Sequence, residues 1–435
     1  MLNISLSFKR LSFYEKCYKV ILVLLITMTS GFPLLINNNM INTAVLLYAT
    51  AGILYFKPNI EWAIRFCTFF FLLNALQTAY FGEFYITTAL NQEMLFCSAA
   101  FSISILGTTF IFIFKKIMVF IAGMASVLFI PILINFNFYN ILYSLSPFKA
   151  VTIANIEGWE PTSYNIFVMN FPPDFFEGLI RNSGPFWEPG SFGGYLIIAL
   201  IFNTLIHNTL WRKDNIILTI AILTTFSTTT YLAFAAFTMG YSFLMLKNVA
   251  LRWILLSILI IGSIIAFNKI EFLGKKIDTE FKEAQYNALE KGGDTRAASA
   301  LLDLKEIQES PLYILFGRGS HPYTRIGGSD KEALRTNGVT DLLSRYGLFF
   351  FIFTVIYLWK SFNLICKLGN TPTSMAYLSV IVIFIISFSE VYFIFVFFKA
   401  LTLFGMTAVQ NKIIICRFRE QEEYKIKPSS LVKIS

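Results

Sequence analysis

The chain contains long stretches without a single charged residue. No Asp, Glu, Lys or Arg occurs in residues 20–56, 94–114, 117–148 or 215–246. An α-helix needs roughly 20 apolar residues to cross the ~30 Å hydrocarbon core of a bilayer, so each stretch can hold one or two membrane spans. The stretches are continuously apolar, whereas the strands of a membrane barrel alternate apolar and polar residues. The pattern therefore predicts an all-α polytopic membrane protein, with residues 1–435 forming one integral membrane domain.

The apolar segments and their charged flanks predict about twelve transmembrane helices. These cover residues 20–36, 40–56, 62–81, 94–114, 117–136, 192–210, 215–230, 231–247, 252–268, 340–359, 375–390 and 391–411. Basic pairs such as Lys115–Lys116 and Arg212–Lys213 fall in alternate connections, and the short loops between them carry few basic residues. By the positive-inside rule, both termini are predicted to be cytoplasmic. The basic N-terminal segment lacks a short apolar core with a small-residue cleavage site, which indicates a cytoplasmic tail and not a removed signal.

Two of the outward connections are long and are predicted to be periplasmic loops, at 137–191 and 269–339. Connections of this length usually carry function. The second loop is predicted to contain two amphipathic helices, the first ending at Gly292–Gly293. The second of these is predicted to have Asp294 as its N-cap and to stop at Pro311.

Composition excludes several classes of protein. Only 14% of the residues are charged, against about 25% in a typical water-soluble domain. Basic loops that fix membrane topology account for the net charge of +9 without a nucleic-acid partner. The five cysteines share no motif spacing, and only two histidines occur, so neither a disulfide framework nor a metal centre is predicted. Cofactor-binding signatures such as a P-loop or a Rossmann glycine fingerprint are absent from the sequence.

The sequence RNSGPFWEPGSFGGYL, residues 181–196, lies where the first large loop enters the membrane. Its prolines cannot continue a helix, and its glycines allow close approach of backbone or ligand. Arg181 and Glu188 would therefore be held stiffly at the hydrocarbon boundary. The alternative is an interfacial anchor, with Trp187 at the level of the lipid headgroups and a surface Arg–Glu pair.

The second large loop carries several arginines spaced among glycines. They are Arg296, Arg318, Arg325 and Arg335, with His321 beside them and with Asp341 and Arg345 at the next helix entrance. A planar guanidinium binds two phosphate oxygens at once, so these side chains could converge on one anion. For each single arginine, a solvated salt bridge is the alternative.

Two further features lie in or beside the spans. FSTTTYL at 226–232, which includes Thr228, places hydroxyls at an outer helix turn, where they either contact a ligand or satisfy helix-end backbone groups. Lys399 lies within the last predicted span and is costly in lipid. It should face the bundle interior or a cavity, unless its ammonium snorkels to an interface.

In its topology and in these motifs the chain resembles the O-antigen polymerase and O-antigen ligase superfamily of bacterial polysaccharide assembly. The stretch from Arg181 to Leu196 is similar to an Arg…Ser-Gly-x-Phe-x-Glu-Pro-Gly pattern of polymerase-like members. The segment from Thr295 through SPLYILFGRGS to TNGVTDLLSRYGL resembles the shared second-loop region. Ligases of the superfamily typically have a His-Asn pair where this chain has Thr336–Asn337, and this departure favours a polymerase.

The resemblance implies metal-independent and cofactor-independent transfer of undecaprenyl-diphosphate-linked glycan chains at the periplasmic face of the bacterial inner membrane. It implies lipid-linked oligosaccharide and the bilayer as partners, with a chain-length regulator and a flippase in the same pathway. Glu188 would act on the acceptor hydroxyl, with Asp341 and His321 as alternates, and arginines including Arg181 would stabilise the diphosphate. The remaining predicted binding residues are Arg296, Arg318, Arg325, Arg335, Trp187, Asn337 and Thr228. A ligase with a lipid A-core acceptor and a flippase of lipid-linked oligosaccharide are the alternatives.

Overall fold

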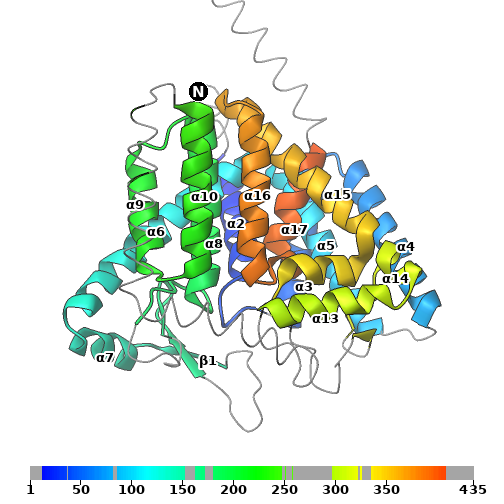
Figure 1. Ribbon diagram of the computed structural model, residues 1–435, viewed down its shortest axis with the longest axis horizontal. Coiled ribbons are helices and arrows are strands. Elements are labelled where there is room, and N and C mark those ends of the chain that lie inside the picture. Colours follow the sequence, from blue (N-terminus) through cyan, green and yellow to red (C-terminus); the bar gives the residue numbers. More distant parts are fainter. Residues whose placement is uncertain are drawn as a thin grey trace, which may run out of the picture.

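The protein is a bundle of antiparallel helices, seen in a computed structural model (Figure 1). The structure describes residues 12–36, 38–81, 86–151, 162–171, 180–246, 250, 257, 296–321, 324–325 and 335–407. The first part of the bundle contains α2 (Phe13–Met28), α3 (Asn39–Phe56), α4 (Glu61–Phe81), α5 (Ile86–Leu106) and α6 (Thr109–Ile134). The middle part contains α8 (Pro189–His207), α9 (Lys213–Thr224) and α10 (Thr228–Met245). The last part contains α15 (Gly338–Gly369), α16 (Ser374–Ser389), η2 (Tyr392–Ile394), α17 (Val396–Leu403) and η3 (Phe404–Thr407).

Five of the described helices, α3, α5, α6, α8 and α15, are long and apolar enough to cross a membrane. This fits the predicted multi-pass membrane protein, while the predicted number of about twelve spans stays a prediction. Helix α8 is the centre of the bundle, because 94% of the residues in its 18-residue apolar segment are buried inside the protein. It is surrounded by α6, α9, α10, α15 and α16.

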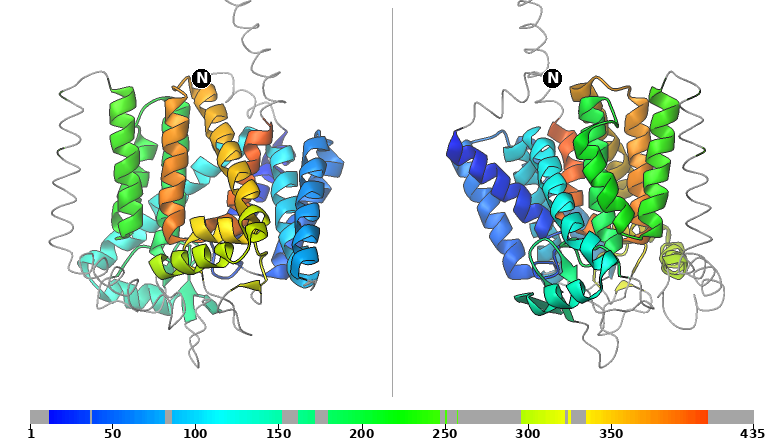
Figure 2. Two further views of the ribbon diagram at one scale, coloured as in Figure 1. Left: turned by 45° about the vertical axis from the view of Figure 1, so that its right-hand side comes forward. Right: turned by 90° about the vertical axis from the view of Figure 1, so that its left-hand side faces the viewer.

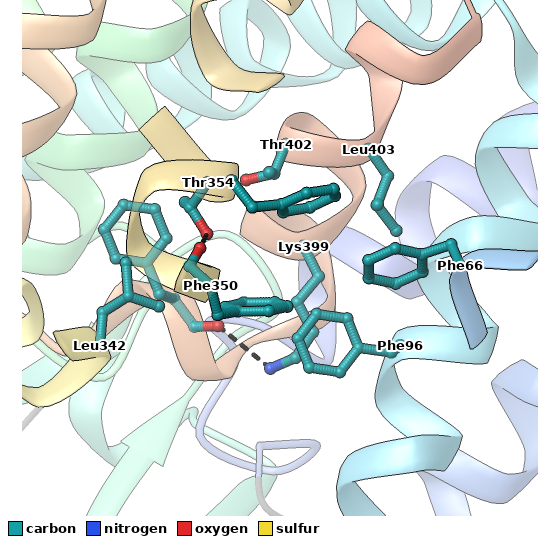
Figure 3. Close-up of a pocket in the computed structure, with 10 residues that line it drawn as sticks. Phe66, Phe96, Leu342, Phe350, Thr354, Lys399, Thr402 and Leu403 are labelled. Carbon is teal, nitrogen blue, oxygen red and sulfur yellow. Dashed lines mark hydrogen bonds between the residues drawn. The ribbon is translucent and has the colours of Figure 1, made fainter. Parts of the chain in front are cut away.

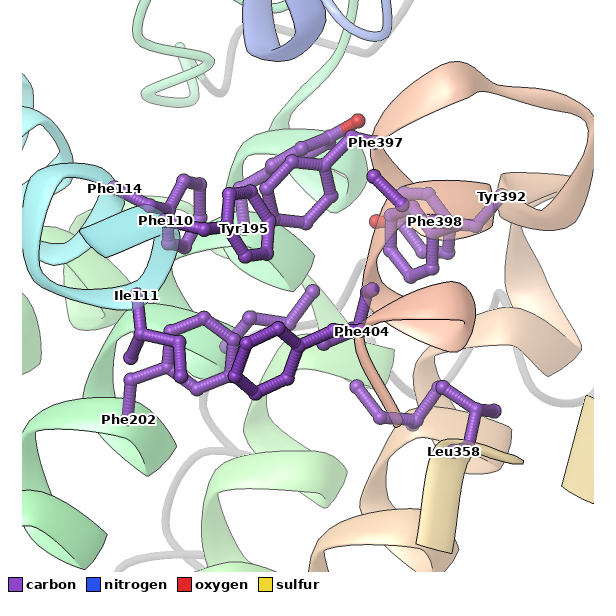
Figure 4. Close-up of a cluster of buried hydrophobic side chains, with 14 of the residues drawn as sticks. Phe110, Ile111, Phe114, Tyr195, Phe202, Leu358, Tyr392, Phe397, Phe398 and Phe404 are labelled. Atoms are coloured by element: carbon purple, nitrogen blue, oxygen red, sulfur yellow. The ribbon is translucent and has the colours of Figure 1, made fainter. Parts of the chain in front are cut away.

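A cluster of aromatic rings fills the space between α6, α8 and the C-terminal helices (Figure 4). The ring of Phe397 lies 4.5 Å from that of Phe114 and 5.0 Å from that of Tyr195, measured between ring centres. The Tyr195 hydroxyl donates to the carbonyl of Ser30 at 2.8 Å, which satisfies a polar group in the core. Aromatic packing of this kind explains why the chain is 17% Phe, Tyr and Trp.

The described parts of both large loops gather at one end of the bundle (Figures 1 and 2). The first loop contributes α7 (Asn137–Ser144) and the strands β1 (Phe148–Val151), β2 (Thr162–Asn165) and β3 (Asn170–Phe171). The second contributes α13 (Arg296–Gln308) and α14 (Pro311–Phe316). This end is called the loop end below. Helices α8, α10 and α15 begin there and α16 finishes there, so their polar termini face the loops.

The three short strands are an addition to the predicted all-α fold. They form an antiparallel sheet in the order β1-β2-β3, with Phe148 opposite Asn165 and Tyr164 opposite Phe171. Met169 and Phe171 pack on Phe129 of α6, so the sheet closes a small second core over the end of that helix. Each strand is too short to give a recognisable alternating pattern in the sequence.

Several helix boundaries differ from the predicted ones. The predicted loop at Lys115–Lys116 is wrong: both residues lie inside α6, and the chain turns at Gly107–Thr108 instead. Lys115 is buried, and its Nζ lies 2.8 Å from Oδ1 of Asn203 and 2.8 Å from Nε2 of His207. These two polar partners on α8 let a lysine remain within an otherwise apolar helix. The charge pattern alone could not reveal them.

Other helix boundaries also differ from the predicted ones. The segment 86–93, predicted to be a loop, is the first part of α5, and the predicted span 391–411 is divided between η2, α17 and η3. The predicted helix after Asp294 is present as α13. Pro311 does not simply stop the chain but begins α14, where Ser310 caps the backbone N–H of Leu312 at 3.3 Å. The first predicted amphipathic helix and the predicted span 252–268 lie outside the described residues, apart from the isolated position 257.

Helix α15 bends sharply at Gly347, and this bend fixes the second loop to the bundle. Gly347 has a φ of 76°, a left-handed conformation that favours glycine. The carbonyls freed by the break accept other donors: the N–H of Arg318 contacts Ser344 O at 2.8 Å, and that of Gly319 contacts Arg345 O at 3.0 Å. Gln77 of α4 also donates to Arg345 O, at 3.0 Å.

Candidate functional site

The segment from Arg181 to Glu188 is a rigid loop that carries its charged residues to the start of α8. The side chain of Asn182 donates to Oγ1 of Thr224 at 2.9 Å and accepts from the N–H of Gly184 at 2.9 Å. Gly184 has a φ of 50°, which closes the turn. Asn170 of β3 donates through Nδ2 to Phe186 O at 3.0 Å. The loop is thus fixed both to the sheet and to the end of α9.

Two carboxylates, Glu188 and Glu390, meet at the start of α8. Glu188 is the N-cap residue of α8, but its side chain does not cap the helix. Glu390 follows the last residue of α16. A Cβ built on Gly190 would lie 3.1 Å from Oε1 of Glu390, 3.5 Å from Oε1 of Glu188 and 3.6 Å from Oγ of Ser227. Both carboxylates therefore face the same small volume above Gly190.

Two arginines balance these carboxylates. Arg296, at the start of α13, donates from Nε to Ser389 O at 3.1 Å, and its guanidinium lies 3.8 Å from Oε1 of Glu390. Arg181 is largely buried, and burial lowers the pKa of its guanidinium, while the nearby charges of Glu188 and Glu390 oppose that shift. The charge of Arg296 also acts on Arg181. These four side chains form one electrostatic unit, called the Glu188 cluster below.

Tyr392 and Trp187 border the Glu188 cluster. The Tyr392 hydroxyl donates to the carbonyls of Gly190 and Ser191, each at 3.2 Å, and so ties η2 to the first turn of α8. The Trp187 ring packs 5.4 Å from the Phe395 ring. Its backbone N–H donates to Gly31 O at 3.1 Å. The predicted anchor residue Trp187 is therefore partly buried against the C-terminal segment.

Thr336 and Asn337 stand beside this cluster. Asn337 caps α15, since its Oδ1 accepts from the N–H groups of Val339 and Thr340 at 3.1 and 3.2 Å. Gly338 packs directly on the backbone of Glu390. Within the described residues, Nδ2 of Asn337 and Oγ1 of Thr336 are buried without a hydrogen-bond partner. These two polar groups lie one and two residues before Gly338, the residue that contacts Glu390.

A second and more deeply buried charge cluster joins α13 to α15. Arg325 donates to Glu306 Oε2 at 2.7 Å, to Asp303 Oδ1 at 2.7 Å and to Asp341 Oδ1 at 3.0 Å. Burial alone would lower the pKa of Arg325, but the three carboxylates raise its pKa above the ordinary value. A charged group this deeply buried is stable only with such partners.

Two more arginines complete this second cluster. Arg335 lies 2.8 Å from Asp303 Oδ1 and 2.5 Å from Glu306 Oε1. Arg345 contacts both oxygens of Asp341 at 3.0 Å. Three arginines thus face three carboxylates, so these residues hold the second loop on α15 and leave little charge to attract an anion. The structure brings the predicted residues Arg325, Arg335 and Asp341 into one cluster, but their charges are balanced within this cluster and do not surround a ligand site.

The remaining predicted residues are placed as follows. Arg318 pairs with Glu309 and lies over the Tyr313 ring, 4.8 Å from the ring centre. The carbonyl of His321 accepts from the N–H and the hydroxyl of Thr324, at 3.1 and 2.8 Å, on the Arg318 side of the loop. Thr228 is the first residue of α10, directly after Ser227.

Lys399 faces the interior, which confirms the prediction for this residue. Its ammonium donates to Phe393 O at 3.0 Å and also to Ile394 O, and lies 4.6 Å from the centre of the Phe96 ring. It lines a narrow pocket with aromatic walls that include Phe66 and Phe350 (Figure 3). Carbonyl oxygens and ring faces surround this ammonium, and none of the carboxylates that the structure describes contacts it.

Glu390 is a site residue that the sequence did not predict. A signal was present, because Glu390 is the only charged residue between positions 368 and 398. A lone carboxylate between two apolar segments is costly unless it has a partner, and Arg296 is that partner. Ser227 and Tyr392 gave no comparable signal, since single hydroxyl residues are frequent at helix ends.

Comparisons with known proteins gave no match. No protein-family model, curated protein or solved structure is similar to this chain at a significant level.

Proposed function

We propose that the protein is a polysaccharide polymerase that transfers undecaprenyl-diphosphate-linked glycan chains onto lipid-linked repeat units. The observation that carries the proposal is the Glu188 cluster: two arginines and two carboxylates at the mouth of a buried helix. A lipid-linked substrate needs a site that is polar and yet close to the hydrocarbon, because its isoprenoid tail stays in the bilayer.

The charges suit the chemistry of glycosyl transfer from a lipid diphosphate. The acceptor hydroxyl oxygen attacks the anomeric carbon, the bond from that carbon to the phosphate oxygen breaks, and its electron pair stays on the leaving diphosphate. Arg181 and Arg296 stabilise this negative charge, which develops as the bond breaks. The proton of the acceptor hydroxyl passes to Glu188.

Glu390 keeps Arg296 in place and balances its charge in the resting site. The buried amide of Asn337 and the hydroxyl of Thr336 supply hydrogen bonds to sugar hydroxyls beside it. The N-terminus of α8 adds a favourable electrostatic field for an anion. Arg325 and Arg335 are excluded from the diphosphate role in this proposal, because each already contacts at least two carboxylates.

The proposal places the loop end in the periplasm of a bacterium, at the inner membrane. This orientation follows from the basic residues in the connections at the opposite end, including Arg212 and Lys213. The Thr336–Asn337 pair, in place of the His-Asn of ligases, favours a polymerase over a ligase. A flippase or ligase would give a different result in the following experiment.

The test is polymer formation by the purified protein in vesicles with a lipid-linked oligosaccharide as both donor and acceptor. We expect a ladder of products, and Glu188→Gln should abolish most of it. Glu61→Gln is the matched control, because Glu61 pairs with Arg65 in an exposed position far from the loop end. Transfer only to an added lipid A-core acceptor would indicate a ligase. Movement of substrate across the bilayer without new glycosidic bonds would reject the polymerase proposal.

A further inference from the structure

Two cysteines and a glutamate converge between α4 and α5, away from the Glu188 cluster. Sγ of Cys67 on α4 lies 3.3 Å from Sγ of Cys97 on α5. Glu93 is one helical turn before Cys97, and its Oε1 lies 3.7 Å from the Cys97 sulfur. The three potential ligand atoms all lie within 4.8 Å of one another. Sequence spacing gave no indication of this group, because the cysteines are on different helices.

The distances suit a shared ion better than a covalent link. A disulfide requires sulfurs about 2.05 Å apart, much closer than the distance seen here. Two thiolates bound to one tetrahedral zinc ion at about 2.3 Å each have sulfurs about 3.8 Å apart. The observed spacings between sulfur and sulfur and between sulfur and oxygen are near the edge lengths of such a tetrahedron.

The second oxygen of Glu93 is an independent indication of a cation site. Oε2 is buried and has no hydrogen-bond partner within the described part of the chain. No ion pair to Glu93 is seen among the described residues either. An ionised carboxylate inside an apolar bundle is costly without a compensating charge, and a bound cation would supply one.

We propose that Cys67, Glu93 and Cys97 bind a thiophilic divalent cation of the zinc class, with water as a fourth ligand. Binding replaces the thiol protons, which leave to solvent, so the two thiolates and the carboxylate coordinate the ion. This site is independent of the proposed glycosyl transfer, which uses no metal. The proposal differs from the sequence-based prediction that the chain has no metal centre.

The position of α4 gives the ion a structural role. Helix α4 packs mainly on α5 and touches α14. At the loop end, Gln77 fixes α4 by donating to Phe316 O at 2.7 Å and to Arg345 O at 3.0 Å. Cys67 lies six residues after Glu61, the first residue of α4. It is therefore roughly 9 Å along the helix axis from the end of α4 that lies away from the loop end. A shared ion would fasten the first half of α4, the half that contains Cys67, to α5.

The experiment measures zinc in the full-length protein purified in detergent under reducing conditions. We expect about one equivalent of zinc after loading with zinc chloride and removal of the excess. Cobalt substitution should give thiolate-to-metal charge-transfer absorption. Cys67→Ser and Cys97→Ser should each weaken zinc binding by about tenfold or more, whereas Cys17→Ser and Cys366→Ser should not. Glu93→Gln should weaken binding while keeping the side-chain shape.

A measurement on the unsubstituted protein guards against misfolded variants. Bound zinc should protect Cys67 and Cys97 from alkylation, and a chelator should restore their reaction, as detected by peptide mass spectrometry. Absence of zinc after loading would overturn the proposal. So would a Cys67–Cys97 disulfide in protein purified with reductant, or zinc binding that persists unchanged in both serine variants.

Discussion

Glu188 and Glu390 direct their carboxylates toward the same glycine, although they belong to different helices and lie 202 positions apart in the sequence. A Cβ at Gly190 would lie 3.1 Å from Oε1 of Glu390 and 3.5 Å from Oε1 of Glu188. The first is tighter than ordinary van der Waals contact, so the absence of a side chain at position 190 keeps both carboxylates near the start of α8. Glu390 in turn contacts Arg296. The first large loop, the second large loop and α16 therefore meet near Gly190, through Glu188, Arg296 and Glu390.

Gly190→Ala should reduce polymer formation at least tenfold while leaving the protein folded. The added methyl group displaces the Glu390 carboxylate, but alanine is a better helix former than glycine in the first turn of α8. The measurement is polymer formed per folded protein, with melting temperature followed in parallel. Gly123→Ala is the control, because a Cβ there meets only Ile217 at 3.7 Å, an ordinary contact. Equal activity of the two variants would show that carboxylate placement above Gly190 is unimportant.

Glu188→Gln should lower turnover by about 10²–10⁴-fold, the usual cost of losing a general base. The amide keeps the shape of the side chain but cannot accept the proton. Glu390→Gln should have a smaller effect on turnover and should weaken donor binding, because Arg296 loses its counter-charge. Initial rates at several donor concentrations separate the two effects. If Glu390→Gln were the more damaging change in turnover, Glu390 and not Glu188 would be the base.

Arg325→Met should destabilise the protein by about 3–5 kcal/mol, because it leaves three buried carboxylates with one cation fewer. Thermal unfolding in detergent should show a lower melting temperature, and protease should cut the second loop more readily. Arg65→Met is the control, since its ion pair with Glu61 is exposed and such pairs contribute little. An unchanged melting temperature of Arg325→Met would mean that this cluster does not hold the loop.

The sequence allowed the helical membrane fold to be predicted because apolar length and charge position depend on local residues alone. Arg181, Glu188 and the interior position of Lys399 could be found in the same way, as charges at or inside apolar segments. The partners of these charges could not. The sequence predicts that Arg325 and Arg335 could bind an anion, but Asp303 and Glu306 of α13 form ion pairs with these two loop residues.

Boundary errors had a similar cause. Lys115 predicts a loop, because a lysine in hydrocarbon is costly. Asn203 and His207, on α8, remove much of that cost.

Cys67 and Cys97 are 30 positions apart, a spacing that matches no metal motif, and only the packing of α4 on α5 brings them together. Each missed feature depends on a contact between helices, which the periodicity of one segment does not encode.

The side of the membrane that the loop end faces can be tested with single cysteines. Ser144 on α7 is exposed at the loop end, and Trp211 is 68% exposed at the opposite end. In a chain with its native cysteines replaced by serine, Ser144→Cys should react with a membrane-impermeant thiol reagent added to intact spheroplasts. Trp211→Cys should react only after the membrane is permeabilised. The reason is the excess of Lys and Arg in the connections at the Trp211 end.

The reverse labelling pattern would place the Glu188 cluster in the cytoplasm, where the proposed polymerisation does not take place.

Arg181→Lys distinguishes a bound diphosphate from an interfacial anchor at the start of α8. Lysine keeps the positive charge but loses the planar fork that binds two phosphate oxygens, so donor binding should weaken and turnover should fall. An anchor role predicts a different outcome: Arg181→Lys would be nearly silent, and Trp187→Ala would lower protein abundance more than specific activity. The measurement is polymer formed per folded protein at low and saturating donor concentrations. Near-normal activity of Arg181→Lys at both concentrations would remove Arg181 from the site and leave Arg296 as the cation that meets the diphosphate.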